Sequence, residues 1–390
     1  MRMSGKQAVM AVTFSGLERI PKEQKPDVEM IMEWSVMTDY TELANRRMNR
    51  LNVALCKAFM DDGRRACIIK GTSMGVLYPE PLRRDVGDVD VWMAGGYDDV
   101  SEYLRGKFSG VKGGRHGHHL SVKVNGVSVE VHFVPAELYA SRNNRRLRSF
   151  FREIELSPWD ARMRVDGGGC IVVPEPHVEL VIAVVHIFHH WAFEGIGMKQ
   201  VLDCYWLLKY VDGLCGECGG SADDGSGAAG ADDAKRGTLN GGAAGTDDAK
   251  HGTLNGGAAR ADEIRGAAMA LFQEVGIATF VAALMYVMQQ LGMDKSAMLC
   301  VPNVKYGERL LDDIMNTGVV SAEELAKGRF GKESKPHKFF RRLRRVLRMM
   351  PMAPVELPCM LMKNTWGWVL GRMKRFGIRT VKHKHTHNQA

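Results

Sequence analysis

The stretch from Ile69 to Met93, IKGTSMGVLYPEPLRRDVGDVDVWM, decides the fold. It reads as the end of a strand, a glycine-containing turn, a proline-rich loop and then a second strand. Asp88 and Asp90 are two positions apart, and residues at that spacing share one face of an extended strand. Val89 and Val91 then point to the opposite face, toward a core. We therefore expect the two carboxylates to lie side by side.

The paired carboxylates of Asp88 and Asp90 indicate a metal site, because neighbouring carboxylates repel each other unless a cation neutralises them. Mg²⁺ takes oxygen ligands and is usually held by one or two carboxylates together with substrate phosphates. The pattern Asp-x-Asp also occurs in surface turns that bind nothing. Here the pair is embedded in a strand of Val and Trp residues, so we favour the metal-binding interpretation.

A third acid, Glu130, lies on a predicted hairpin. Residues 118–134, HHLSVKVNGVSVEVHFV, contain two alternating runs joined at Asn125-Gly126, which is a strong signal for a two-residue turn. Glu130 and His132 share the polar face of the second run, opposite its valines. If this strand is a neighbour of the aspartate strand, three carboxylates converge. Two-metal phosphoryl transfer requires such an arrangement.

These residues also carry a family resemblance. The order is Lys-Gly, then Tyr-Pro-x-Pro-x-x-Arg-x-x-x-Asp-x-Asp, then Glu-x-His on a later strand. It resembles the polymerase-β-type nucleotidyltransferase superfamily, and within it the bacterial uncharacterised nucleotidyltransferase family. The matching positions are Tyr78, Pro79, Pro81, Arg84, Asp88, Asp90, Glu130 and His132. The resemblance runs from about residue 45 to about residue 210. It departs from the superfamily in Gly71-Thr72-Ser73, which replaces Gly-Ser, and in a longer gap before the aspartates.

The resemblance implies an α+β fold, a polymerase-β-like mixed sheet backed by helices, and we expect an added helical region and a basic C-terminal tail beside it. It implies Mg²⁺-dependent transfer of a nucleoside monophosphate from an NTP, with two ions and with Mn²⁺ as an alternative metal. The acceptor is an unidentified hydroxyl or phosphate. Asp88, Asp90 and Glu130 would be the metal ligands and catalytic carboxylates. The other residues expected to bind nucleotide are Lys70, Gly71, Thr72, Ser73, Arg84 and His132.

A second class of function stays open at this point. A non-catalytic or antitoxin-like adaptor would keep the same fold and act through the basic tail. Three intact carboxylates argue against decay of an active site, since a repulsive cluster has no structural use. The acceptor also stays open among a sugar phosphate, a protein side chain, an RNA end and a small antibiotic, as do the preferred NTP and the oligomeric state.

The composition is that of a globular protein, with 45% hydrophobic and 25% charged residues among 390. Eight cysteines are scattered along the chain, which indicates reduced thiols rather than a disulfide scaffold. The first residues are too polar for a secretion signal, and no run approaches about 20 apolar residues. We therefore expect a cytoplasmic protein, with peripheral attachment to a membrane as an alternative.

Positive charge is concentrated at the C-terminal end. The net charge is +8, and residues 327–390 hold 17 Lys and Arg but only 2 Asp and Glu. Such a segment docks on the acidic body of its own chain, on an anionic membrane surface or on nucleic acid. Residues 335–384 are the segment expected to meet the last two partners. One face of a predicted helix there carries Phe339, Phe340, Leu343, Val346, Leu347 and Met350.

Two groups of histidines lie near the predicted site. His116, His118 and His119 precede the hairpin strand, but a zinc site needs a third or fourth ligand at a defined spacing. We expect one of them to help position phosphate or substrate. The histidines of residues 176–210, which we predict to form two packed helices broken near Gly195, share one helical face. For His186, His189 and His190 we favour packing and substrate placement over metal ligation.

A repeat interrupts the helical part of the chain. The segment GAAGADDAKRGTLNG is followed by GAAGTDDAKHGTLNG, a period of 15 residues. One Leu and a few alanines per unit cannot build the stacked core of a solenoid, and the Gly and Asp content favours disorder. Deleting this insertion should leave the core intact. The predicted organisation is an N-terminal extension (1–26), a nucleotidyltransferase core (27–160), a helical region (161–215), a disordered insertion (216–261), a second helical stretch (262–326) and a basic tail (327–390).

Overall fold

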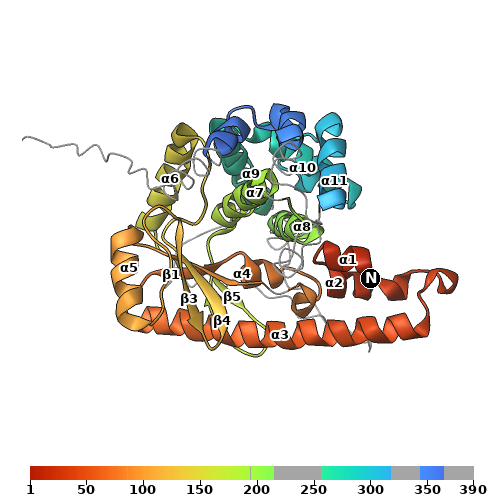
Figure 1. Ribbon diagram of the computed structural model, residues 1–390, viewed down its shortest axis with the longest axis horizontal. Helices are drawn as coiled ribbons and strands as arrows, with labels where there is room; N and C mark the ends of the chain where they lie inside the picture. The colour runs from red at the N-terminus through yellow and green to blue at the C-terminus, as the bar shows by residue number, and fades with distance from the viewer. Residues whose placement is uncertain (86, 194, 215–255, 318–342, 364–390) are drawn as a thin grey trace, which may run out of the picture.

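The structure is a computed structural model of the 390-residue chain. It describes residues 1–85, 87–193, 195–214, 256–317 and 343–363 (Figure 1). Most of the predicted insertion, and the tail residues Phe339, Phe340 and 364–390, therefore lie outside the described residues.

A mixed four-stranded sheet forms the centre of the first half of the chain. Its strands are β1 (Ala66–Ile69), β2 (Val89–Met93), β3 (His119–Val124) and β4 (Val127–His132), in the order β1-β2-β4-β3. β2 runs antiparallel to β1 and parallel to β4, and β3 runs antiparallel to β4. The aspartate strand and the glutamate strand are therefore neighbours, and the α+β prediction is confirmed.

The hairpin between β3 and β4 forms as predicted. Asn125 and Gly126 have φ values of 49° and 81°, the left-handed values that a two-residue turn of type I′ requires. Apolar and polar residues alternate along β4, and Val129 and Val131 on its apolar face are completely buried. One face of the strand thereby enters the core, and Glu130 on the other face lines a cavity.

A single long helix, α3 (Val28–Asp61), runs along the sheet (Figure 1). It begins at Asp27, whose carboxylate accepts a hydrogen bond from the Met30 N–H at 2.8 Å. On this helix Met48, Leu51, Leu55 and Phe59 are buried, whereas Leu43 is 47% exposed. Leu43 ends a stripe of exposed apolar residues on the N-terminal half of the helix, namely Val28, Met32, Val36, Tyr40 and Leu43.

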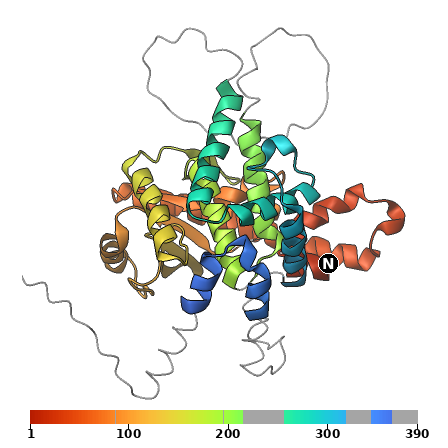
Figure 2. The same ribbon diagram turned by 90° about the horizontal axis from the view of Figure 1, so that it is seen from above.

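The second half of the chain is helical and packs over the site side of the sheet. Figure 2 shows its helices gathered at the centre of the molecule. They are α7 (Pro176–Phe193), α8 (Met198–Gly213), α9 (Gly256–Glu274), α10 (Ala278–Gln290) and α11 (Val304–Thr317). The break between α7 and α8 confirms the predicted interruption near Gly195. The remaining elements are α1 (Arg2–Lys6), α2 (Met10–Phe14), α4 (Gly71–Gly75), α5 (Gly96–Lys107), α6 (Ser141–Leu156), β5 (Arg162–Arg164) and β6 (Cys170–Val172).

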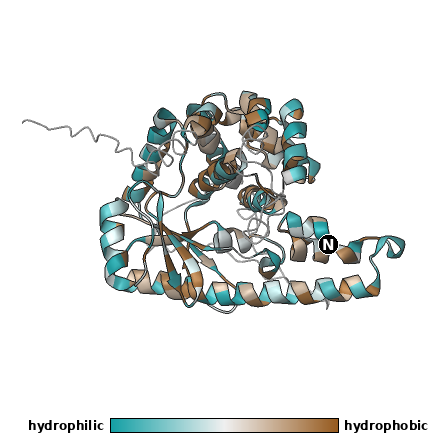
Figure 3. Cartoon of the chain, in the orientation of Figure 1, coloured by the Kyte–Doolittle hydropathy of each residue, from teal (hydrophilic) through white to brown (hydrophobic). Residues whose placement is uncertain are grey.

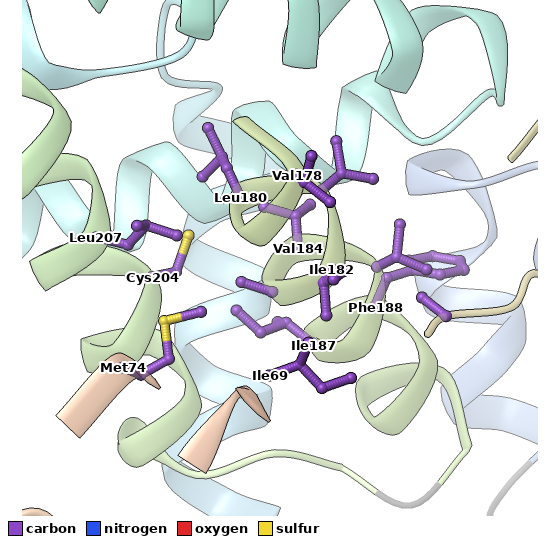
Figure 4. Close-up of a cluster of buried hydrophobic side chains, with 14 of the residues drawn as sticks. Ile69, Met74, Val178, Leu180, Ile182, Val184, Ile187, Phe188, Cys204 and Leu207 are labelled. Carbon is purple, nitrogen blue, oxygen red and sulfur yellow. The ribbon is translucent and has the colours of Figure 1, made fainter. Parts of the chain in front are cut away.

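Helix α7 is the centre of the core. Its sequence is apolar on nearly every side, which is typical of a helix that is buried all round. Figure 3 shows the hydrophobic residues concentrated there, and Figure 4 shows Ile182, Val184 and Phe188 packed among side chains of β1, α4 and α8. One continuous apolar cluster runs from the sheet through α7 to the later helices. This packing fixes α7 against the sheet.

The structure differs from the predicted insertion at its C-terminal end. Helix α9 begins at Gly256, so residues 256–261 are helical and not disordered. Ala261 is fully buried and packs with Val211 of α8 and Ile264 of α9. Residue 261 was assigned to a disordered insertion, but here its small side chain fits between two packed helices.

The described part of the basic tail packs on its own chain. Val346, Met349 and Met360 are buried in the main core, and the Arg345 guanidinium binds Asp313 at 2.6 Å and the Trp191 carbonyl at 2.6 Å. Over residues 343–363 much of the predicted apolar face is therefore covered by the chain itself, whereas Leu347 stays 56% exposed. Among the described helices, none has the length and apolar character needed to cross a membrane.

A buried carboxylate ties this tail to the first half of the chain. Glu356 is fully buried and accepts hydrogen bonds from the N–H groups of Tyr139 and Ala140, at 2.7 and 3.0 Å, and from the Asn143 side chain at 2.8 Å. Ala140 is the residue before α6, so Glu356 caps that helix from the far end of the sequence. Orphan N–H groups at a helix start are stabilised by such an acceptor.

Candidate active site

A cavity of about 490 Å³ lies between the sheet and helices α7 and α8. Its walls are rich in ionisable side chains. They include Lys70, Arg84, Asp88, Asp90, His118, His119, Glu130, His132, Glu137, His186, His189, His190, Lys199 and Asp203. The three acids predicted from the sequence, Asp88, Asp90 and Glu130, all line the cavity. Six histidines line it too, three from the hairpin segment and three from α7.

The β2–β4 pairing brings the acids together. Asp90 lies directly opposite Glu130 in the parallel register, and oxygen or nitrogen atoms of Asp90, Glu130 and His132 lie within 4.8 Å of one another. Asp88 was expected within the strand, but β2 begins at Val89, so Asp88 stands just before it and is exposed. The buried Val89 and Val91 anchor the strand on its other face.

The acids have unequal electrostatic environments. Burial opposes ionisation of Asp90, but the Lys70 ammonium, 3.2 Å away, and the His132 ring, 2.8 Å away, hold its pKa well below the usual range. Burial and then repulsion by Asp90 raise the pKa of Asp88. Burial raises the pKa of Glu130 too, although His119 partly opposes this. A cation placed among the three would therefore relieve the charge repulsion.

The donor set fits a hard divalent cation. Asp88, Asp90 and Glu130 offer carboxylate oxygens on one side of a cavity that has room for a ligand, and Mg²⁺ prefers such oxygens. Among the described residues, the Lys70 ammonium is the cation paired with Asp90.

Lys70 stands at a strained turn between β1 and α4. Its φ and ψ are 56° and −149°, a region that is essentially restricted to glycine and costs about 1–3 kcal/mol. Glu179 of α7 stabilises this turn, because its Oε1 accepts from the Lys70 N–H at 2.9 Å and lies 2.5 Å from the Ser73 hydroxyl. Burial raises the pKa of Glu179 to about 7. Glu179 was not among the residues predicted for the site, although an isolated acid in an apolar helix indicates a buried role.

The hydroxyls expected to contact phosphate point elsewhere. The Ser73 side chain is buried, and its hydroxyl donates to the Lys70 carbonyl at 2.7 Å. Thr72 accepts from the Asn52 amide at 2.6 Å. Gly71 lines the cavity, but neither Thr72 nor Ser73 does. The turn therefore directs these hydroxyls into the fold, where they stabilise the turn itself.

Arg84 also has a structural partner. Its guanidinium forms a two-point ion pair with Asp203, at 2.6 and 2.8 Å, and the Tyr78 hydroxyl donates to the same carboxylate at 2.8 Å. The positive charge of Arg84, which was expected to meet a triphosphate, is therefore already paired with the Asp203 carboxylate. Lys199 of α8, which the sequence analysis missed, lines the same cavity, and no spacing in the sequence distinguished it from other lysines.

Burial favours the neutral ring in several of the cavity histidines. Burial lowers the pKa of His132 and of His189 to about 4, and that of His118 to about 2. His116 is exposed and does not line the cavity. The histidines of α7 do line it, opposite the hairpin.

The family model described as uncharacterised nucleotidyltransferase matches residues 1–214, so the match begins at residue 1 and not near residue 45. Among solved structures, the chain is similar to an antigenic nucleotidyltransferase-like protein from Paracoccidioides brasiliensis, with 15% identity over 42% of this chain and 75% of that chain and a TM-score of 0.28. No curated protein matches the chain.

Proposed function

Because the chain belongs to the family of uncharacterised nucleotidyltransferases, we propose that it transfers a nucleoside monophosphate from an NTP to a hydroxyl or phosphate acceptor and releases pyrophosphate. The observation that carries the proposal is the register of β2 and β4, which sets Asp90 beside Glu130, with Asp88 just before the strand. These acids line one cavity with Lys70 and Lys199.

Each group has a role that its surroundings support. Asp88, Asp90 and Glu130 would hold Mg²⁺, which when bound lowers the pKa of the attacking hydroxyl and stabilises charge on the leaving oxygen. Glu130, with its raised pKa, is the acid best suited to accept a proton from the acceptor. Lys70 and Lys199 supply positive charge at the cavity wall, where charge develops on phosphate oxygens.

The test is calorimetric titration of ATP, GTP, CTP and UTP, each with and without Mg²⁺. We expect one NTP to bind in a Mg²⁺-dependent manner, and we expect Asp88→Asn and Asp90→Asn together to weaken that binding at least tenfold. The matched control is Asp39→Asn, which changes an exposed acid on α3. Undiminished Mg²⁺-dependent binding in the folded double variant would refute the assignment.

The adaptor alternative receives no support from the described residues. It depended on a basic tail free to meet a membrane or nucleic acid, and residues 343–363 are packed on the chain's own core. Failure of every NTP to bind the folded wild-type protein would reopen it.

A further inference from the structure

A cluster of three imidazoles lies beside the carboxylates. His119 pairs with His132 in the β3–β4 ladder, and His118 immediately precedes β3. The sequence analysis found no third ligand at a fixed spacing for His118 and His119. The hairpin supplies one, because its turn brings His132 back to the level of His119. One nitrogen from each of the three rings lies within 4.8 Å of the others.

The spacing of the first two rings is that of metal ligands. Nδ1 of His119 is 3.2 Å from Nε2 of His118. Two nitrogens bound to a tetrahedral zinc ion at 2.0–2.1 Å are about 3.3 Å apart. The third ring, His132, is fully buried, and its Nδ1 has no hydrogen-bond partner in the described structure. Buried polar atoms without a hydrogen-bond partner are rare in folded proteins, and a bound ion would account for this one.

The other nitrogen of each ring faces a carboxylate. His118 Nδ1 is 3.9 Å from Glu137, His119 Nε2 is 3.6 Å from Glu130, and His132 Nε2 is 2.8 Å from Asp90. Glu137 is itself paired with Arg148. Metal-binding histidines usually direct their second nitrogen to a carboxylate, which fixes the ring and the tautomer. His132 follows this pattern at hydrogen-bond distance, and the second nitrogens of His118 and His119 approach their carboxylates to 3.9 and 3.6 Å. This leaves Nε2 of His118, Nδ1 of His119 and Nδ1 of His132 to meet one ion.

We propose that His118, His119 and His132 form a binding site for a transition-metal ion of the zinc class. This site adjoins the oxygen site of Asp88, Asp90 and Glu130 but uses different ligand atoms, because the nitrogens of His119 and His132 that face Glu130 and Asp90 are not the ones proposed to bind the ion. Imidazole nitrogen suits zinc and its neighbours, whereas Mg²⁺ prefers oxygen. Three protein ligands leave a fourth position open, as in catalytic zinc sites. That position belongs to a cavity whose opposite wall carries the histidines of α7.

The test uses metal-stripped full-length protein, titrated with Zn²⁺ in a calorimeter and with Co²⁺ as a spectroscopic probe. We expect one equivalent of each, a visible absorption band of four-coordinate Co²⁺, and no displacement by excess Mg²⁺. His119→Gln should weaken Zn²⁺ binding at least tenfold and remove the band. The matched control His116→Gln, at an exposed histidine in the same segment, should change neither. Glu137→Gln should keep all three ligands and weaken binding about tenfold.

The outcomes separate this site from the proposed function. Asp88→Asn changes no group in contact with the three rings, so it should impair Mg²⁺-dependent NTP binding while Zn²⁺ still binds. Absence of stoichiometric Zn²⁺ binding to the folded wild type would overturn the proposal. So would equal Zn²⁺ affinity in wild type and His119→Gln, or displacement of Co²⁺ by Mg²⁺ at similar concentrations. Circular dichroism of each variant establishes that the fold is kept.

Discussion

Replacing Glu179 by Gln should change how the stability of this protein depends on pH. The Glu179 carboxyl is 4% exposed, and burial raises its pKa from an ordinary value of 4.5 to about 7. Between these values the folded protein holds the proton more tightly than the unfolded chain does. The free energy of unfolding therefore falls as the pH rises from about 4.5 to about 7. The total loss is about 3 kcal/mol, because one pH unit corresponds to about 1.4 kcal/mol.

Glu179→Gln keeps the shape of the protonated acid and cannot ionise. Its carbonyl oxygen can still accept from the Lys70 N–H. We expect the variant and the wild type to unfold at similar urea concentrations near pH 4.5, and the variant to be more stable by about 3 kcal/mol near pH 8. Urea unfolding over that pH range measures the difference.

The control is Glu153→Gln, at an exposed acid on α6, whose unfolding should follow the wild type at every pH. If the stability difference between Glu179→Gln and wild type were the same at both ends of the pH range, the buried carboxyl would not titrate as the structure requires. The account of the Lys70 turn would then be wrong.

Three further changes have definite expected outcomes. Arg84→Met leaves the Asp203 carboxylate buried without its partner, so the free energy of unfolding in urea should fall by about 3–5 kcal/mol. Adding Asp203→Leu should restore most of this stability. An unchanged free energy of unfolding would mean that water already solvates Asp203. Deleting residues 216–255 should keep the melting temperature within a few degrees, whereas deleting 216–261 should lower it clearly by removing the buried Ala261. Equal melting temperatures for the two deletions would contradict the packing of α9 on α8. Glu356→Ala should cost about 1–3 kcal/mol in urea unfolding, because the N–H groups at the start of α6 lose their acceptor, and a stability equal to wild type would show that another group caps the helix.

The local features of the sequence predicted the sheet well. Alternation of valines with polar residues, together with Asn125-Gly126, predicted the hairpin, because strand faces and tight turns depend on neighbouring residues. The paired aspartates indicated a site for the same reason. The pairing of β2 with β4 was stated only as a condition, since a parallel neighbour 40 residues away leaves no local trace.

The partners of the buried charges could not be predicted. Arg84 was assigned to a phosphate because its partner, Asp203, lies 119 residues further along the chain. Ser73 was assigned to the nucleotide for a similar reason, since Glu179 reaches it from α7. In the structure each side chain has a protein partner that the local sequence does not indicate, because the packing of α7 and α8 on the sheet decides which groups become neighbours. The histidine cluster was missed because its third member comes from the opposite strand of the hairpin.

The capping of α6 by Glu356 has a consequence for biosynthesis. Asn143 and Glu356 are 213 residues apart, and ribosomes add roughly 5–20 residues per second. Helix α6 therefore waits roughly 10–40 s for its cap, and the apolar surface that residues 343–363 later cover stays accessible to other chains meanwhile. We expect a chain that ends near residue 320 to aggregate where the full-length protein does not, and sedimentation of the two after synthesis in a cell-free system would test this. The first half of the molecule thus completes its folding only after the last described helix has been synthesised.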